Sequence, residues 1–160
     1  MNRFTYTTRT LLALTLVVAL AVFFWPKPDP SAPDPRWRET LLDNSKPLWN
    51  VPDVSLASHK DGQVFVTATN IGRTTLEYRG ISQSRISLFQ EVRSGSVWQK
   101  DAWSVDGMCE GFYEIAPGES VRLEIEFWDD DKAARMLGKF SEKGTDRSGV
   151  VVLATNDKLD

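Results

Sequence analysis

Residues 120–128 read Ser-Val-Arg-Leu-Glu-Ile-Glu-Phe-Trp, and this stretch decides the fold class. Apolar and charged side chains alternate along it. Successive side chains of a β-strand point to opposite faces of the sheet, so a period of two predicts a strand with one buried face and one face in water. The buried face takes Val121, Leu123, Ile125 and Phe127, and the wet face takes Arg122, Glu124 and Glu126.

Other short strands, bounded by turn residues, are expected on either side of this stretch. Residues 63–69 alternate in the same way and end at Asn70-Ile71-Gly72, while Ser94-Gly95 and Pro117-Gly118 supply later turns. The continuous apolar run at 149–154 suggests a strand that is buried on both sides. The expected strands are 63–69, 75–78, 85–92, 96–103, 120–128 and 149–154. Roughly five to eight strands at spacings of about ten residues predict an all-β fold, an antiparallel two-sheet sandwich.

One short helix is expected to interrupt this all-β pattern at 132–140, where Ala133, Met136, Leu137 and Phe140 recur at helical spacing. Asp129-Asp130-Asp131 precede it, and acidic residues suit the positive end of a helix. A calcium site is the alternative for these three acids, but the spacing of an EF-hand loop is absent. We therefore predict no metal site.

An apolar segment without charge lies at residues 10–26, between Arg9 and Lys27. As a helix it would span about 25 Å, at the short edge of what crosses a hydrocarbon core of about 30 Å. A retained single-pass anchor and a secretory signal cleaved at Ala19-Leu20-Ala21 are the two interpretations. The aromatic Phe23-Phe24-Trp25 suits the outer membrane interface and favours the anchor.

The charges on either side of this segment predict its orientation. The first nine residues carry Arg3 and Arg9 and no acid, whereas the far side mixes bases with Asp29 and Asp34. Positive charge is retained in the cytoplasm, so residues 1–9 are expected inside, residues 10–26 in the lipid bilayer, and the rest of the chain outside the cell membrane. No cysteine occurs in or just after the segment, which excludes a lipoprotein anchor.

A proline-rich linker is expected at 27–53, because seven of the eight prolines of the chain lie between Pro26 and Pro52. Proline at this density favours an extended, stiff chain, which would hold the folded part away from the membrane. Residues 36–44 could form a short helix that packs on the domain through Trp37 and Leu41. Residues 54–160 then form the β-sandwich, long enough for a single hydrophobic core.

The charge balance argues against nucleic acid as a partner. Residues 1–25 contain two arginines and no acid, so the remainder has 17 basic and 22 acidic side chains and a net charge of −5. An acidic domain of this kind is a poor ligand for phosphate backbones.

No catalytic set is evident, and we predict no enzyme and no cofactor. Cys109 is the single cysteine and His59 the single histidine, so nucleophilic catalysis would depend entirely on His59, in a polar stretch predicted as a turn. Cys109 is expected to be a small buried residue, with an intermolecular disulfide or a reactive thiol as alternatives. Arg93-Ser94-Gly95-Ser96 lacks the lysine of a phosphate-binding loop.

Three tryptophans could form a stacking platform for a sugar or a peptide: Trp98, Trp103 and Trp128. Packing within a small sandwich is the alternative for the same rings.

Two motifs resemble those of exported bacterial immunoglobulin-like domains. The Val-Thr-rich stretch 64–72 ends in Asn-Ile-Gly, and Pro117-Gly118-Glu119-Ser120 opens a later strand, with Trp98 between them. The resemblance covers roughly residues 54–128 and implies an immunoglobulin-like sandwich without catalytic residues. It does not extend past Trp128.

These features together predict a membrane-tethered, extracytoplasmic interaction module whose partner is a protein or an envelope polymer. An inhibitor or regulator of an envelope protease, acting through the loops at 82–85 or 94–96, is the alternative function. A domain secreted after signal cleavage is the alternative location.

Overall fold

The computed structural model describes residues 15, 32–42, 45–60, 63–104, 111–128 and 132–156. The chain divides into two compact units, Met1–Ala32 and Pro33–Asp160. Thr15, which is helical, is the one described residue of the expected anchor at 10–26, so that prediction otherwise lies outside the described residues. Among the described residues, no helix has the length and apolar character needed to cross a membrane.

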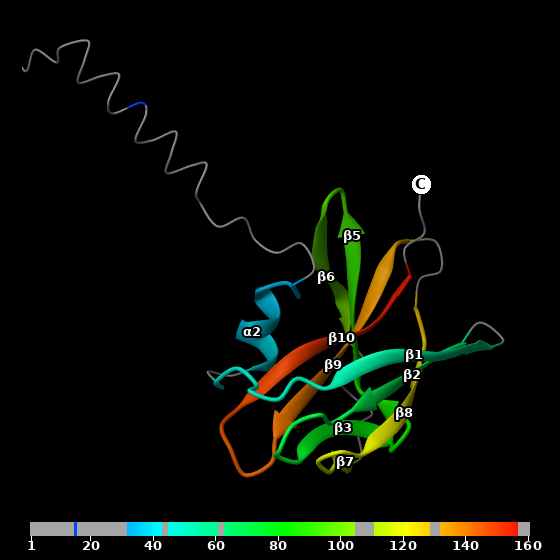
Figure 1. Ribbon diagram of the computed structural model, residues 1–160. Coiled ribbons are helices and arrows are strands. Elements are labelled where there is room, and N and C mark those ends of the chain that lie inside the picture. The colour runs from blue at the N-terminus through cyan, green and yellow to red at the C-terminus, as the bar shows by residue number, and fades with distance from the viewer. Residues whose placement is uncertain are drawn as a thin grey trace, which may run out of the picture. The chain divides into compact units, whose positions relative to one another are not determined.

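The described part of the second unit is almost entirely β-structure (Figure 1). Its elements are α2 (Arg36–Leu41), β1 (Asp53–Lys60), β2 (Gln63–Thr69), β3 (Leu76–Ser82), β4 (Arg85–Ile86), β5 (Leu88–Ser94), β6 (Val97–Ser104), β7 (Gly111–Ile115), β8 (Ser120–Ile125), β9 (Ala134–Glu142) and β10 (Ser148–Asn156).

The strands form two antiparallel sheets, which confirms the predicted all-β class. The smaller sheet has the order β1-β2-β8. The larger sheet has the order β4-β3-β9-β5-β6, with β10 paired to β9 and β7 paired to β3. Side chains from both sheets meet in the main core: Val66, Ala68, Leu76, Tyr78, Ile86, Leu88, Ile115, Val121, Leu123, Ile125, Met136, Phe140 and Leu153.

Strand β8 confirms the alternation from which the fold class was predicted. Val121, Leu123 and Ile125 are buried, while Arg122 between them is exposed. The regular strand ends at Ile125 and is shorter than the predicted 120–128. The turns predicted at Ser94-Gly95 and Pro117-Gly118 are also present, and both glycines have a positive φ.

The helix predicted at 132–140 is wrong, because this segment forms strand β9. Strand β9 pairs with β3 and β5 and also with β10, so both of its edges are occupied. Its side chains are buried on both faces: Met136 and Phe140 lie in the main core, and Leu137 lies in a second cluster. With no face in water the alternation disappears, and the remaining apolar spacing happens to match a helix. The acidic residues 129–131 lie outside the described residues.

Two further strands, besides β9, were not predicted. Strand β1 runs to Lys60, through residues expected to form a turn, and its register shifts between Leu56 and Ser58. A bulge of this kind interrupts the alternation that identifies a strand in a sequence. Strand β7 (Gly111–Ile115) lies in a stretch for which no strand was expected.

Strand β10 extends the predicted strand 149–154 by a residue or two at each end. Val150 and Val152 pack against the second cluster, whereas Val151 and Leu153 pack in the main core. Apolar neighbours therefore lie on both faces, as predicted. Within the described part of the chain, however, β10 pairs only with β9 and forms an edge of the sheet.

The compact unit includes much of the expected linker, since it begins at Pro33. The helix expected within 36–44 is present as α2, and Trp37 on it is buried against Phe89 and Leu137 in the second cluster. The Trp37 and Phe89 rings meet edge to face, with their centroids 5.3 Å apart. Residues 27–31 lie outside the described part of the chain.

Candidate binding groove

A buried carboxylate holds the beginning of the N-terminal segment, residues 33–51, on the larger sheet. Glu91 of β5 accepts hydrogen bonds from the backbone N–H of Asp34 at 2.7 Å and from Nε1 of Trp37 at 2.6 Å. Its other oxygen accepts from Arg135 of β9, and both side chains are almost completely buried. A buried carboxylate is stable only when its oxygens accept hydrogen bonds or pair with a positive charge. The docked segment supplies two of the hydrogen bonds that Glu91 needs.

Charged side chains lie beside the contact between residues 34–37 and Glu91. Lys100 lies over the Trp37 ring with its Nζ 4.6 Å from the centroid, and Arg135 lies 4.8 Å from the centre of Trp98. Asp34 accepts a hydrogen bond from the backbone N–H of Lys100 at 3.1 Å. The hydrogen bond and charge of Arg36 lower the pKa of Asp34 to about 2, so this carboxyl is ionised at neutral pH.

A second buried carboxylate holds the end of the same segment. Glu142 of β9 accepts hydrogen bonds from the backbone N–H groups of Trp49 at 2.6 Å and Asn50 at 3.0 Å. The Asn50 side chain then donates to Oδ1 of Asn70 at 2.6 Å. The segment is therefore anchored near both ends by glutamates of adjacent strands.

Between these two anchors Lys46 contacts the start of β10 and the turn that precedes it. The backbone N–H of Lys46 donates to the carbonyl of Asp146, and the N–H of Ser148 donates to the carbonyl of Lys46, both at 2.9 Å. These two bonds form an isolated parallel bridge between Lys46 and Arg147. The hydroxyls of Ser45 and Ser148 lie 2.5 Å apart beside it. Pro47, which has no N–H, follows at once.

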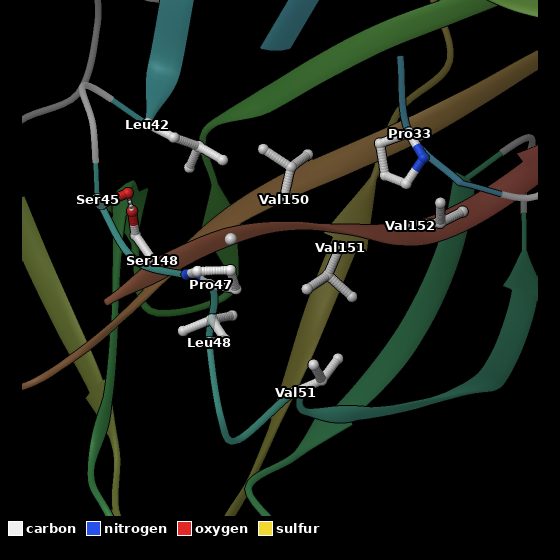
Figure 2. A pocket seen from close by; sticks show the side chains of 11 residues that line it. Pro33, Leu42, Ser45, Pro47, Leu48, Val51, Ser148, Val150, Val151 and Val152 are labelled. Carbon is white, nitrogen blue, oxygen red and sulfur yellow. Dashed lines mark hydrogen bonds between the residues drawn. The ribbon is translucent and has the colours of Figure 1, made fainter. Parts of the chain in front are cut away.

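An open groove of about 490 Å³ lies where the segment leaves the edge of β10 (Figure 2). Figure 2 shows Val150 and Val152 on the side of Pro33 and Leu42, and Val151 on the side of Leu48 and Val51. The lining is almost entirely apolar: Pro33, Leu42, Ser45, Pro47, Leu48, Val51, Ser148, Gly149, Val150, Val151 and Val152.

A second depression of about 560 Å³ adjoins the groove and shares Val51 with it. Trp49 and Ile71, which also line it, are 80% and 70% exposed. The guanidinium of Arg147 lies 3.5 Å from the centre of the Trp49 ring. Large apolar side chains that remain in water next to a groove are typical of interaction surfaces.

The residues singled out for catalysis or metal binding lie largely outside the described part of the chain. His59 lies in β1 and pairs with Val64, while Cys109 and the acids 129–131 fall outside the described part. Across 15, 32–42, 45–60, 63–104, 111–128 and 132–156, no three His, Cys, Asp or Glu side chains gather as metal ligands.

The expected tryptophan platform is divided between the two sheets. Trp98 lies on β6 of the larger sheet under Arg135, whereas Trp128 follows β8 of the smaller sheet and packs against the main core. Trp103 also lies on β6, and its side chain is not among those that the structure describes. The half-buried Trp128 supports the packing alternative for that ring.

Of the two loops considered for an inhibitor, the turn between β3 and β4 is held by two hydrogen bonds to its backbone carbonyls. Tyr78 donates its hydroxyl to the carbonyl of Gln83 at 2.6 Å, and the N–H of Glu124 donates to the carbonyl of Ser84 at 2.8 Å. Burial raises the pKa of Tyr78 to about 12, so the hydroxyl remains a donor. The turn between β5 and β6 is a tight reversal at Gly95, whose φ is +63°.

Comparison with models of protein families and with curated proteins finds no match for this chain. The groove is therefore defined by its geometry alone. Sequence reasoning missed Glu91 and Glu142, because each stands among other polar residues of its strand and nothing in the sequence sets it apart.

Proposed function

We propose that this chain is a membrane-tethered, extracytoplasmic binding module that captures a protein partner in the groove beside β10. The observation that carries the proposal is an apolar groove that runs along an open sheet edge and has no side-chain charge in its lining. Concave apolar sites with few polar groups are where proteins bind ligands, and an exposed strand edge is where they bind chains.

The tether part of the proposal depends on the sequence. The uncharged residues 10–26 serve as the anchor in the lipid bilayer, and residues 27–32, with Pro28 and Pro30, serve as the spacer before the compact unit. Washing membranes with alkaline carbonate tests this part. The protein is expected to stay with the membrane at the full mass of 18.0 kDa. Release of a soluble chain that lacks about the first 21 residues would favour the cleaved signal instead.

We also propose an immunoglobulin-like class for the two-sheet unit. Its support is the two antiparallel sheets, the Asn70 turn in which Gly72 donates to the Asn70 side chain, and the Pro117-Gly118 corner before β8. An immunoglobulin-like unit commonly serves as a binding scaffold.

Photocrosslinking in the cells that make the protein tests the binding site. A benzoylphenylalanine at Val51, which is 52% exposed in the groove, is expected to give one discrete adduct with a protein partner. The control is the same residue at Leu56, which is 71% exposed on β1 of the other sheet. Adducts of equal yield at both positions, or none at Val51, would contradict the groove as the binding site.

The second candidate function is an inhibitor of an envelope protease. The observation that favours it is the braced turn at Gln83 and Ser84, because a rigid exposed loop resists cleavage while it occupies an active site. Alanine substitutions at both residues would abolish capture of a protease if this function is correct, and would leave crosslinking from Val51 unchanged if the groove is the site.

A further inference from the structure

We infer that the occupant of the groove is an extended, uncharged segment of the partner that adds to β10 as a new strand. The inference rests on the proposed function and names the kind of ligand. It depends on three features of the groove: the direction of the backbone groups of β10, the bridge at Lys46, and the polarity of both walls.

The backbone of β10 presents hydrogen-bonding groups to the groove. The N–H of Ser148 points away from β9, since it donates to Lys46, whereas the carbonyl of Arg147 accepts from Glu142 of β9. The direction of the backbone groups alternates along a strand, so the N–H and C=O groups of Val150 and Val152 point away from β9 too. Among the described residues no strand pairs with this edge beyond Ser148.

The bridge at Lys46 has already begun to extend the sheet on this edge. Its two hydrogen bonds supply the first rung, and among the described residues the segment 47–51 makes no further backbone hydrogen bond to β10. The unpaired positions at Val150 and Val152 follow next along β10. Because Lys46 occupies the edge at Ser148, the free edge in the groove runs from Gly149 to Val152. It offers about 10 Å at ~3.3 Å per residue, which is room for a strand of about four residues.

The walls of the groove specify the side chains of that strand. Alternate side chains of an added strand would point to opposite walls. One wall consists of Pro33 and Leu42 with Val150 and Val152, and the other of Leu48 and Val51 with Val151. Because both walls are apolar, the ligand needs a continuous run of apolar residues and no charge, rather than an alternating sequence.

A second copy of the chain fits the groove less well than a single segment does. Pairing of β10 with β10 of another molecule would bring two edges together, and each edge is flanked by its own residues 33–51 on both sides (Figure 2). An isolated segment has no such flanks. The structure therefore favours a partner that contributes one extended stretch.

The test uses the full chain in phosphatidylcholine nanodiscs and a fluorescein-labelled peptide. The peptide has five valine and isoleucine residues between two lysines at each end, and empty nanodiscs provide the background. We expect saturable binding by fluorescence anisotropy, and slower hydrogen exchange of two further amides in the fragment that contains β10. The same peptide N-methylated at every core residue should not bind, since it keeps the side chains and loses the N–H donors.

Two substitutions at one position separate the backbone from the side chain. V150P removes an N–H that points away from β9, and proline is tolerated on a strand edge of this kind, so at least tenfold weaker binding is expected. V150T keeps the N–H and the shape, and it should retain most of the binding. The exchange rates of the β9 amides report whether each variant is folded.

Each other result would overturn the inference. Equal binding of the N-methylated peptide would mean that the groove takes apolar side chains without strand pairing. Self-association that is lost in V150P, without peptide binding, would identify a second copy as the occupant. Failure of the unmodified peptide to bind, while Val51 still crosslinks a partner, would leave the proposed function in place and reject strand addition. Failure of both experiments would reject the proposed function as well.

Discussion

Strands β8 and β9 have similar apolar content and opposite surroundings. Strand β8 covers the core with one face and exposes the other, whereas β9 is flanked by strands along both edges and buried on both faces. The alternation of β8 is visible in the sequence because its charged side chains face water and its apolar side chains face the core. The second face of β9 is covered by α2, which comes from a segment about 100 residues earlier in the chain.

The largest difference in unfolding free energy is expected between substitutions of two arginines, each of which lies over an aromatic ring. Arg135 of β9 is 3% exposed and pairs with buried Glu91, while Arg122 of β8 is exposed and lies 4.5 Å from the centre of Phe65. Arg135→Leu strands a buried carboxylate and should lower the free energy of unfolding by about 3–5 kcal/mol. Arg122→Leu should change it by less than about 0.5 kcal/mol. Urea denaturation followed by tryptophan fluorescence measures both, and equal costs would contradict the comparison.

The next difference in stability concerns residues on β8 and β9 whose side chains point away from the main core. Leu137 is fully buried against Trp37 and Phe89, so Leu137→Ala should cost about 3 kcal/mol and speed hydrogen exchange in α2. Glu124 on β8 is half-buried and accepts a hydrogen bond from Gln63 at 2.9 Å. Glu124→Ala should cost about 1 kcal/mol or less. A cost below about 1 kcal/mol at Leu137 would mean that α2 does not cover that face in solution.

A smaller effect is expected at Gly138, in the middle of β9. A Cβ at this position would lie 2.8 Å from Cδ1 of Ile86 and 2.9 Å from Cδ1 of Leu153. Both are ends of flexible side chains in a packed core, so Gly138→Ala should cost about 1–2 kcal/mol. Thermal unfolding measures the effect, and Gly95→Asn in an open turn is the control, since nothing lies within 4 Å of a Cβ there. A neutral Gly138→Ala variant would indicate a looser core than the structure contains.

The smallest expected effect depends on pH and concerns the attachment of α2. Because the pKa of Asp34 is lowered in the folded protein from 3.8 to about 2, its ionised form stabilises the fold above about pH 4. That contribution is lost as the pH falls toward about 2. Asp34→Asn should therefore cost about 1 kcal/mol at pH 7 and only a small part of that at pH 2, where Asp34 is about half protonated. A difference that is constant over this range would assign the effect to packing and not to charge.

Sequence reasoning succeeded where one face of a strand meets water or where a turn requires a glycine. Strands β2 and β8 and the turns at Gly95 and Gly118 belong to this group. It failed at β9, where two covered faces erase the period, and at β1, where a bulge after Leu56 shifts it. The two failures have different causes: the neighbours that cover β9 are distant in the chain, whereas the bulge in β1 lies in its own hairpin with β2.

The groove could not have been predicted for a reason similar to that at β9. Its lining combines residues 33–51 with residues 148–152, which the sequence places in an expected spacer and in the last strand. What brings them together is a pair of buried glutamates that bind backbone N–H groups. Every residue except proline supplies such a group, so the sequence of the segment carries little trace of the interaction.

The attachment of this segment also determines how the unit would respond to mechanical load. Tension on the chain before Pro33 would act first on the two hydrogen bonds from Asp34 and Trp37 to Glu91. These bonds would break one after the other. Glu142 would still hold Trp49 and Asn50 at the far end. Pro33 and Leu42 form one wall of the groove, so a pull from that side would widen the groove before the sheets yield.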